Sequence, residues 1–235
     1  MFIENRLLIA AAIIPAIILL VYIYKKDHLE KESASLLIKL VLFGIISTAL
    51  ASITETIGIA VLPYFIKSGS TIYNLVLYFV VVACSEEGFK YLLVKLKTWK
   101  NPEFNCQFDG VVYSVFVSLG FALWENINYV IEYGFSTAIA RAVTAVPGHA
   151  CFGVYMGAFY GMAKKFDICG MNKESKIFRV LSFVVPMILH GTYDYIASSV
   201  SNTGFWIFVI FVIILFIITF KLVKKLSDDD RYIVN

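Results

Sequence analysis

The sequence predicts an all-α integral membrane protein, a polytopic bundle of about seven transmembrane helices. Of its 235 residues, 60% are hydrophobic and only 16% are charged, whereas soluble domains carry about 25% charged residues. The mean hydropathy of +0.80 indicates the same class. Several apolar stretches reach the length of about 18 residues at which a segment becomes a candidate membrane span. Because these stretches use nearly the whole chain, we expect one membrane-embedded domain over residues 1–235.

Seven segments define the predicted spans. They lie at about 7–24, 36–62, 72–96, 108–131, 137–162, 177–199 and 204–222. The first lacks a small-residue cleavage site before Lys25, so we expect it to be retained as a span. The second is long and contains Glu55, Gly58 and Pro63. It predicts either one tilted helix or a helix followed by a re-entrant segment.

Basic residues alternate sharply between the two ends of these spans. One end carries fifteen of them: Lys25, Lys26, Lys31, Lys95, Lys97, Lys100, Lys164, Lys165, Lys173, Lys176, Arg179, Lys221, Lys224, Lys225 and Arg231. The other end carries Arg6 and Lys67. Basic loops stay in the cytoplasm, so this pattern predicts an outside N-terminus and a cytoplasmic C-terminus. The same placement explains the basic residues without nucleic-acid binding.

The four cysteines include no C-x-x-C pair, so we expect no disulfide framework.

The third span contains charged residues where a membrane helix should be apolar. Glu86, Glu87 and Lys90 lie between apolar runs, and each charge near the middle of a span costs about 2.5–3.5 kcal/mol on insertion scales. We therefore expect them to face the interior of the bundle. Glu86 and Lys90 are one helical turn apart and can pair. Such a pair alone would orient helices, but it does not require a second glutamate.

Three further spans each contribute ionisable residues. Glu125 lies in the fourth span and His149 in the fifth, while His190 and Asp194 share one face of the sixth. The spacing of His190 and Asp194 suits a carboxylate that orients an imidazole, or two metal ligands. Pro186 removes a backbone hydrogen bond one turn before His190. Single membrane histidines often make only interhelical hydrogen bonds, but four contributing spans favour a functional cluster near the membrane midplane.

Other polar or small residues in the spans have simpler interpretations. Gly153, Gly157 and Gly161 form overlapping G-x-x-x-G motifs, which we expect to pack closely against another helix. Glu55 is either a peripheral member of the cluster or a polar contact near the outer interface. The seventh span carries no ionisable residue before Lys221, so we expect it to face lipid.

The cluster suits hydrolysis of a peptide bond within the membrane. A partly desolvated glutamate can act as a general base, and histidine can stabilise an oxyanion. Alternatively, carboxylates and imidazoles can hold Zn²⁺. The H-E-x-x-H and G-x-S-x-G motifs are absent, and no paired aspartyl motif occurs. A proton-coupled transporter is the main alternative, because intramembrane carboxylates also mark ion pathways. A seven-span receptor or sensor without enzymatic activity is a third reading.

The order of these motifs resembles the PrsW family. Glu86 to Lys90 matches its E-E-x-x-K motif, Phe121 to Glu125 its F-x-x-x-E motif, and His190 to Asp194 its H-x-x-x-D motif. His149 lies where that family also tends to carry a histidine. The resemblance covers most of the chain. It implies a protease of the bacterial cell membrane, related to CAAX-processing and bacteriocin-processing proteases. Those relatives usually carry a histidine at the position of Glu125.

The resemblance also implies a substrate and roles for the residues. The substrate would be a single-pass membrane anti-sigma factor, cut first on its extracytoplasmic side, which starts the release of a stress-response sigma factor. Glu86 would activate water, and Glu87 would support it or pair with Lys90. The expected catalytic set is Glu86, Glu87, Glu125, His149, His190 and Asp194, with Asp194 orienting His190. A zinc ion, if used, would be held by Glu86, Glu125, His149 and His190.

Overall fold

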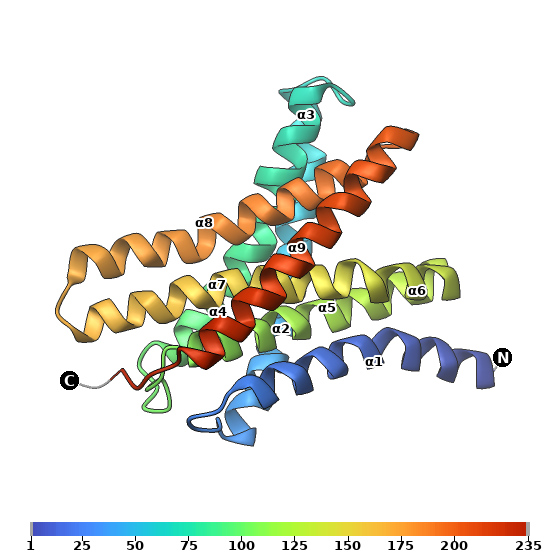
Figure 1. Ribbon diagram of the computed structural model, residues 1–235. Helices are drawn as coiled ribbons and strands as arrows, with labels where there is room; N and C mark the ends of the chain where they lie inside the picture. Colours follow the sequence, from blue (N-terminus) through green and yellow to red (C-terminus); the bar gives the residue numbers. More distant parts are fainter. Residues whose placement is uncertain (1, 234–235) are drawn as a thin grey trace.

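The computed structural model describes residues 2–233, with side chains from residue 9 onward. Within that range the regular elements are helices, and one isolated antiparallel bridge joins Cys106 to Tyr232 (Figure 1). The helices are α1 (Phe2–Lys26), α2 (Ala34–Val61), η1 (Leu62–Tyr64), α3 (Thr71–Leu75), η2 (Val76–Ala83, a π-helix), α4 (Cys84–Thr98), α5 (Asp109–Tyr133), α6 (Phe135–Val143), α7 (Ala145–Ile168), α8 (Asn172–Ala197) and α9 (Asn202–Asp228).

Among the described residues, seven helical segments are long and apolar enough to cross a membrane, which confirms the predicted fold class. The second predicted span is one unbroken α-helix, α2, followed directly by η1 at Leu62–Tyr64. A separate re-entrant segment is therefore not present there. The seventh span, α9, exposes isoleucines on its outer face, among them Ile210, Ile214 and Ile217, as expected for a helix that contacts lipid.

Two spans contain irregularities that the sequence pattern did not predict. The third span passes from α3 through the π-helix η2 into α4, so its hydrogen-bond register changes just before Glu86. The fifth span breaks at Thr144, whose φ and ψ of −124° and −71° separate α6 from α7. Both irregularities lie within one or two turns of a predicted site residue, and π-helical turns often occur at functional sites.

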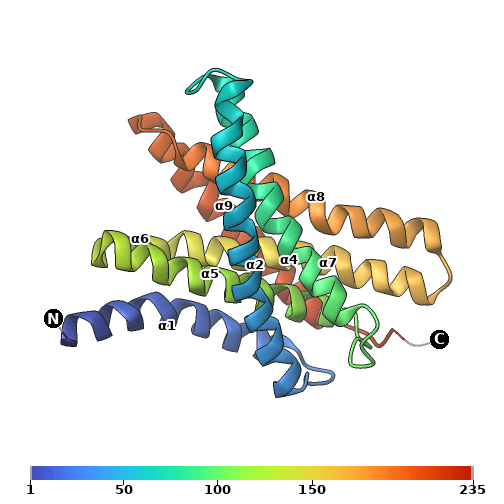
Figure 2. The same ribbon diagram turned by 180° about the vertical axis from the view of Figure 1, so that it is seen from behind.

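The helices cross where glycines allow their backbones to touch. A Cβ at Gly44 of α2 would lie 2.2 Å from the carbonyl oxygen of Val117, and one at Gly120 of α5 would lie 2.2 Å from that of Val41. Since neither position accommodates a side chain, α2 and α5 cross in direct backbone contact. Figure 2 shows α2 running steeply across α1, α5 and α7 instead of parallel to them.

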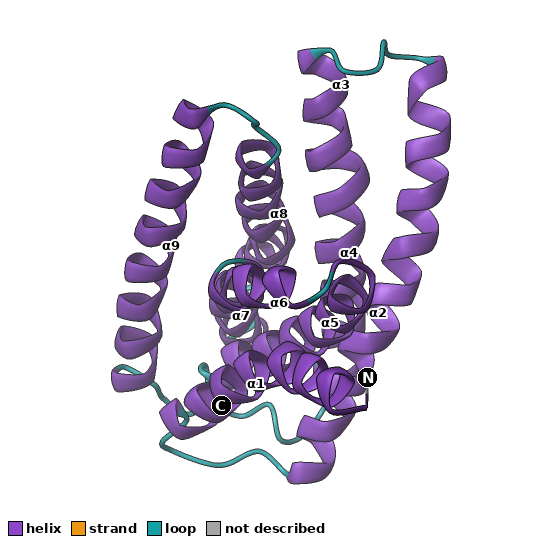
Figure 3. Ribbon diagram, turned by 90° about the vertical axis from the view of Figure 1, so that its right-hand side faces the viewer, coloured by secondary structure: helices purple, strands orange, loops and turns teal. Residues whose placement is uncertain are grey.

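The predicted glycine motif of the fifth span packs against α5. A Cβ at Gly157 would lie 2.3 Å from the carbonyl oxygen of Gly110, and one at Gly161 would lie 2.1 Å from that of Gln107. The resulting α5–α7 pair forms the buried centre of the bundle, and α5 is buried over most of its length. In Figure 3 the hairpin of α2 and α3 and the hairpin of α8 and α9 extend in the same direction past α6.

Candidate active site

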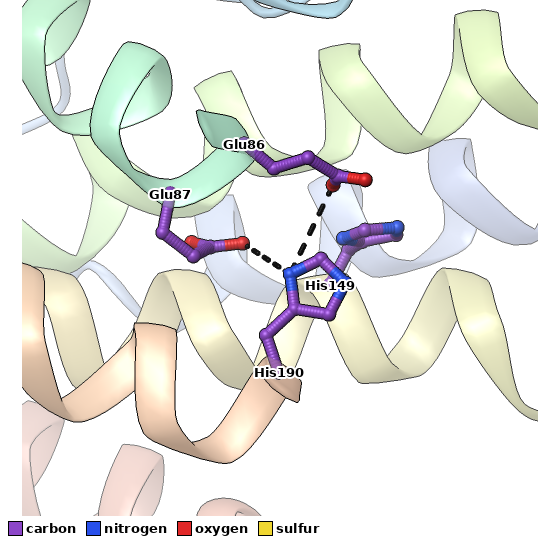
Figure 4. Close-up of side chains that lie close together, drawn as sticks. All are labelled: Glu86, Glu87, His149 and His190. Carbon is purple, nitrogen blue, oxygen red and sulfur yellow. Dashed lines mark hydrogen bonds and ion pairs between the residues drawn. The ribbon is translucent and has the colours of Figure 1, made fainter. Parts of the chain in front are cut away.

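Four side chains from three helices meet inside the bundle. Glu86 and Glu87 come from α4, His149 from α7 and His190 from α8, and each offers a ligand atom within 4.8 Å of the others (Figure 4). All four are buried, with Glu87 fully enclosed and Glu86 5% exposed. The sequence assigned these residues to three different spans, and the crossing of α4, α7 and α8 brings them together.

Lys90 is the positive charge at the centre of this group. Its Nζ donates to Glu87 Oε1 at 2.7 Å and to Glu86 Oε2 at 3.2 Å, and it lies 3.1 Å from His149 Nδ1. The ammonium group also lies 3.9 Å from the ring centre of Phe121, a cation–π contact. A fully buried lysine is stable only when paired, and Lys90 has both glutamates as partners.

His190 lies between two carboxylates. Its Nδ1 is 3.0 Å from Glu87 Oε1 and 3.9 Å from Glu86 Oε2, while its Nε2 is 3.3 Å from Asp194 Oδ2. The ring of Phe152 stacks on it at 4.8 Å between centres. This geometry agrees with the expected role of Asp194, because a carboxylate bonded to one ring nitrogen fixes the orientation of the imidazole.

His149 has a similar partner. Its Nε2 lies 2.9 Å from Glu125 Oε2, and that same oxygen accepts a hydrogen bond from Arg141 Nη2 at 2.8 Å. Arg141 also donates through Nε to Asn126 Oδ1 at 3.0 Å. If the N–H of His149 points to Glu125, its Nδ1 is free to accept from Lys90. A network of hydrogen bonds thus extends from α6 through α5 and α7 to α4.

A cavity of about 450 Å³ adjoins this network. Its wall includes Glu86, Glu125, His149, His190 and Asp194, but Glu87 is not part of it. A second cavity of about 290 Å³ shares Glu55, Glu86, Glu125 and Tyr129 with the first and continues past Glu132 and Tyr133 at the end of α5. Of the paired glutamates, Glu86 and not Glu87 therefore lines these two cavities, in which water or a substrate could lie.

The donor set fits a divalent metal ion. Two carboxylates and two imidazoles are typical ligands for zinc and related metals, and the Oε2 of Glu87 is buried without a hydrogen-bond partner among the described atoms. The carboxylates of Glu55, Glu86, Glu87, Glu125 and Asp194 also outnumber the cations Lys90 and Arg141, which leaves a formal negative charge for a cation to offset.

The four residues that lie close enough to share a metal ion differ in one member from the zinc ligands expected from the sequence. Glu87 is within reach of His149, His190 and Glu86, whereas Glu125 is held to one side by Arg141 and His149 Nε2. All six predicted catalytic residues lie in one connected network. Which of them bind a metal stays a prediction.

Sequence reasoning did not assign a role to Arg141 and left Glu55 undecided. Arg141 pairs with Glu125, and its guanidinium lies 4.1 Å from the ring centre of Tyr129. Glu55 lines both cavities from α2. The sequence did offer a signal for Arg141, because an arginine in an otherwise apolar span requires a buried partner.

Comparison with known proteins identifies relatives over nearly the whole chain. The family model described as "PrsW family intramembrane metalloprotease" matches residues 32–220. The protein named "Protease PrsW" of Geobacillus kaustophilus is 34% identical over 200 residues, covering 85% of this chain and 83% of the relative. Those of Halalkalibacterium halodurans and Bacillus subtilis are 32% and 31% identical, covering 95% and 92% of this chain and 99% and 93% of the relatives. No solved structure matches.

Proposed function

Because the chain belongs to the PrsW family of intramembrane metalloproteases, and is therefore a multi-pass peptidase of a bacterial membrane, we propose that it makes the first cut in a single-pass membrane anti-sigma factor. The cut would start the stepwise proteolysis that releases a stress-response sigma factor. The family resemblance supports this choice of substrate. The cavity is lined by five of the seven apolar helical segments, which supports a substrate that itself lies in the bilayer.

The cavity also supports a cut near the extracytoplasmic surface. Its walls include Ala197 and Ser198 at the end of α8, and the adjoining cavity reaches Glu132 and Tyr133 at the end of α5. The charge pattern assigns these helix ends to the outer side of the membrane. A substrate segment entering from that side would reach Glu86 without passing the basic, cytoplasmic end.

We assign water activation to Glu86 because its side chain lines the wall of both cavities. A general base must lie within hydrogen-bond reach of the water that it deprotonates. Glu87 is enclosed and bonded to Lys90 and His190, so it positions those two groups. A divalent metal bound by Glu86, Glu87, His149 and His190 would supply a Lewis acid and favour ionisation of water.

One side chain on the same wall can stabilise the oxyanion that forms when water attacks the carbonyl carbon. Arg141 lines the cavity, and it carries guanidinium N–H groups beyond those that it donates to Glu125 and Asn126. His190, held by Asp194 and Glu87, lies 3.9 Å from Glu86 Oε2, so a proton could pass between His190 and Glu86 only through a bridging water.

Co-reconstitution with a single-pass anti-sigma factor in liposomes tests this proposal. We expect Glu86→Ala to abolish cleavage while the purified protein remains monodisperse. The matched control is Glu174→Gln, which removes a carboxylate in the first turn of α8, away from the cavity. Cleavage that persists in folded Glu86→Ala protein would contradict the role of Glu86. Cleavage of other single-pass proteins, but not of anti-sigma factors, would contradict the proposed substrate.

A further inference from the structure

A third cavity lies between α4 and α8, on a face of α4 that does not carry the paired glutamates. It is an open groove of about 640 Å³, and its apolar wall includes Phe89, Leu92, Val180 and Phe183. At Gly88, which also lines the groove, an added Cβ would meet only the edge of the Phe183 ring at 3.5 Å. The groove therefore has room for a methyl group beside Gly88, and it is open to the surroundings of the helix bundle.

One end of this groove carries three positive charges. Lys95 comes from the last turn of α4, and Lys176 and Arg179 come from the first turns of α8. None of the three makes an ion pair with a carboxylate among residues 9–233. Arg179 is held in place, because its guanidinium stacks at 5.1 Å on the ring of Trp99 and its Nε donates to Ser175 O at 3.4 Å.

We propose that this groove binds an anionic phospholipid. The phosphate would lie among Lys95, Lys176 and Arg179, and an acyl chain would follow the apolar wall past Gly88 and Leu92. Basic pockets between transmembrane helices favour anionic headgroups, because cations near the membrane surface attract them. The apolar wall selects a lipid over free phosphate, since only a lipid would cover both the charges and the hydrocarbon surface.

The groove connects the lipid to the active-site helices. α4 carries Glu86 and Glu87, and α8 carries His190. A lipid that contacts both helices would bind the folded arrangement more tightly than a separated one, so it would stabilise their packing. This step concerns lipid binding and stability, and it does not depend on the proposed substrate.

Native mass spectrometry of the purified protein with phosphatidylglycerol and phosphatidylcholine of equal chain length tests the proposal. We expect wild-type protein to retain phosphatidylglycerol preferentially, and Lys95→Gln/Lys176→Gln to lower that preference about tenfold or more. Arg179 is left intact because its stacking on Trp99 also supports the fold. The charge-matched control is Lys224→Gln/Lys225→Gln, which removes two exposed lysines from α9 outside the groove. We expect this control to keep the wild-type preference.

Three outcomes would overturn the proposal. The first is equal retention of the two lipids by wild-type protein. The second is an equal loss of preference in the groove variant and the α9 control, which would indicate only general attraction between charges. The third is release of the bound lipid by millimolar inorganic phosphate, which would mean that the apolar wall contributes nothing. As a second readout, phosphatidylglycerol should raise the thermal unfolding midpoint of wild-type protein more than that of Lys95→Gln/Lys176→Gln.

Discussion

Each histidine of the site has a carboxylate on the nitrogen that faces away from the paired glutamates. Glu125 holds Nε2 of His149 at 2.9 Å, and Asp194 holds Nε2 of His190 at 3.3 Å. The Nδ1 atoms then point toward Lys90 and Glu87. This repeated arrangement fixes the orientation of both rings, as outer carboxylates do for metal-binding histidines.

Asp194 should therefore matter for activity and much less for stability. Its side chain is 23% exposed at the cavity wall, so Asp194→Asn changes a charge without creating a buried void. We expect this variant to lose about 10–100-fold in cleavage rate or metal affinity, the usual effect of removing such a partner. Cleavage assays and metal content measured by mass spectrometry give the two values. Asp229→Asn, at the end of α9, is the control, and an equal loss in both variants would contradict the role of Asp194.

A buried carboxylate outside the membrane helices gives a second prediction. Asp27 follows α1 and is fully buried, with neither oxygen hydrogen-bonded to a described group. Burial disfavours its charged form and raises its pKa to about 6. Because the folded pKa exceeds the unfolded one, the protein loses stability as pH rises through about 4 to 6, and the loss is complete above that range.

Asp27→Asn removes the ionisation and should stabilise the protein above pH 6. The rise in the pKa of Asp27 to about 6 corresponds to a loss of about 3 kcal/mol in the free energy of unfolding. At about 2–4 °C per kcal/mol, removing this loss should raise the unfolding midpoint by several degrees. Thermal unfolding in detergent at pH 4.5 and pH 8 measures this effect. The gain should appear at pH 8 and shrink at pH 4.5. A stabilisation of equal size at both values would show that ionisation of Asp27 is not its cause.

The sequence predicted which residues form the site better than how they pair. Helical spacing predicted the His190–Asp194 pair and the Glu86–Lys90 pair, because residues four apart share a face. The Glu87–Lys90 contact, three residues apart in the same helix, was left as one of two possibilities, and Lys90 is closer to Glu87 than to Glu86. The sequence did not predict that Arg141 pairs with Glu125. That contact depends on how two helices cross, which periodicity within one helix does not describe.

At the scale of elements, the π-helix η2 and α8 fit together beside the site. A Cβ at Gly191 would lie 2.6 Å from Cδ1 and 2.7 Å from Cγ of Phe79. These atoms are near the base of the ring, so Phe79 cannot avoid a methyl group by a small rotation. Gly191 directly follows His190, and Phe79 lies in the span that carries Glu86. Their contact therefore sets the distance between the two halves of the site.

Gly191→Ala should separate these halves and lower activity, by about tenfold or more if the site moves by 1 Å. Phe79→Ala removes Cγ and the ring atoms that clash, so the double variant Gly191→Ala/Phe79→Ala should recover part of the loss. Cleavage rates of the two single variants and the double variant form a double-mutant cycle. If the two effects simply add, the contact does not position the site.

The backbone crossing of α2 and α5 carries a larger energetic consequence. Gly120→Ala would place a methyl group 2.2 Å from a backbone oxygen of α2, and backbone atoms cannot move aside as a side chain does. We expect a loss of about 1–3 kcal/mol or more from this overpacking. Gly88→Ala is the control, because its Cβ would meet Phe183 at an ordinary 3.5 Å. Thermal unfolding should separate the two variants, and equal midpoints would contradict the close crossing.

At the scale of the whole molecule, hydropathy was sufficient to find all seven spans, since lipid requires long apolar helices. It was not sufficient to find the π-helix η2 or the break at Thr144. Those irregularities change only the local hydrogen bonding of segments that remain apolar. The steep course of α2 across α5 also depends on which glycines face each other, and the glycine positions alone do not reveal that pairing.

The orientation of the bundle in the membrane is the last prediction, and a natural residue reports on it. Cys169 is exposed in the turn between α7 and α8, while Cys106 and Cys151 are buried. This turn lies at the basic end of the bundle, so the charge pattern places it in the cytoplasm. A membrane-impermeant maleimide should therefore leave Cys169 unlabelled in intact spheroplasts and label it after permeabilisation.

A matched reporter for the opposite side completes this test. Ser68 is exposed in the turn that joins η1 to α3, at the end predicted to lie outside. In a Cys169→Ser background, Ser68→Cys should be labelled in intact cells, whereas the background protein should not be. The reverse pattern would place the basic loops outside. The two cavities that extend from Glu86, one to Ser198 and the other to Glu132, would then face the cytoplasm. The proposed extracytoplasmic cut would be wrong even if Glu86 is catalytic.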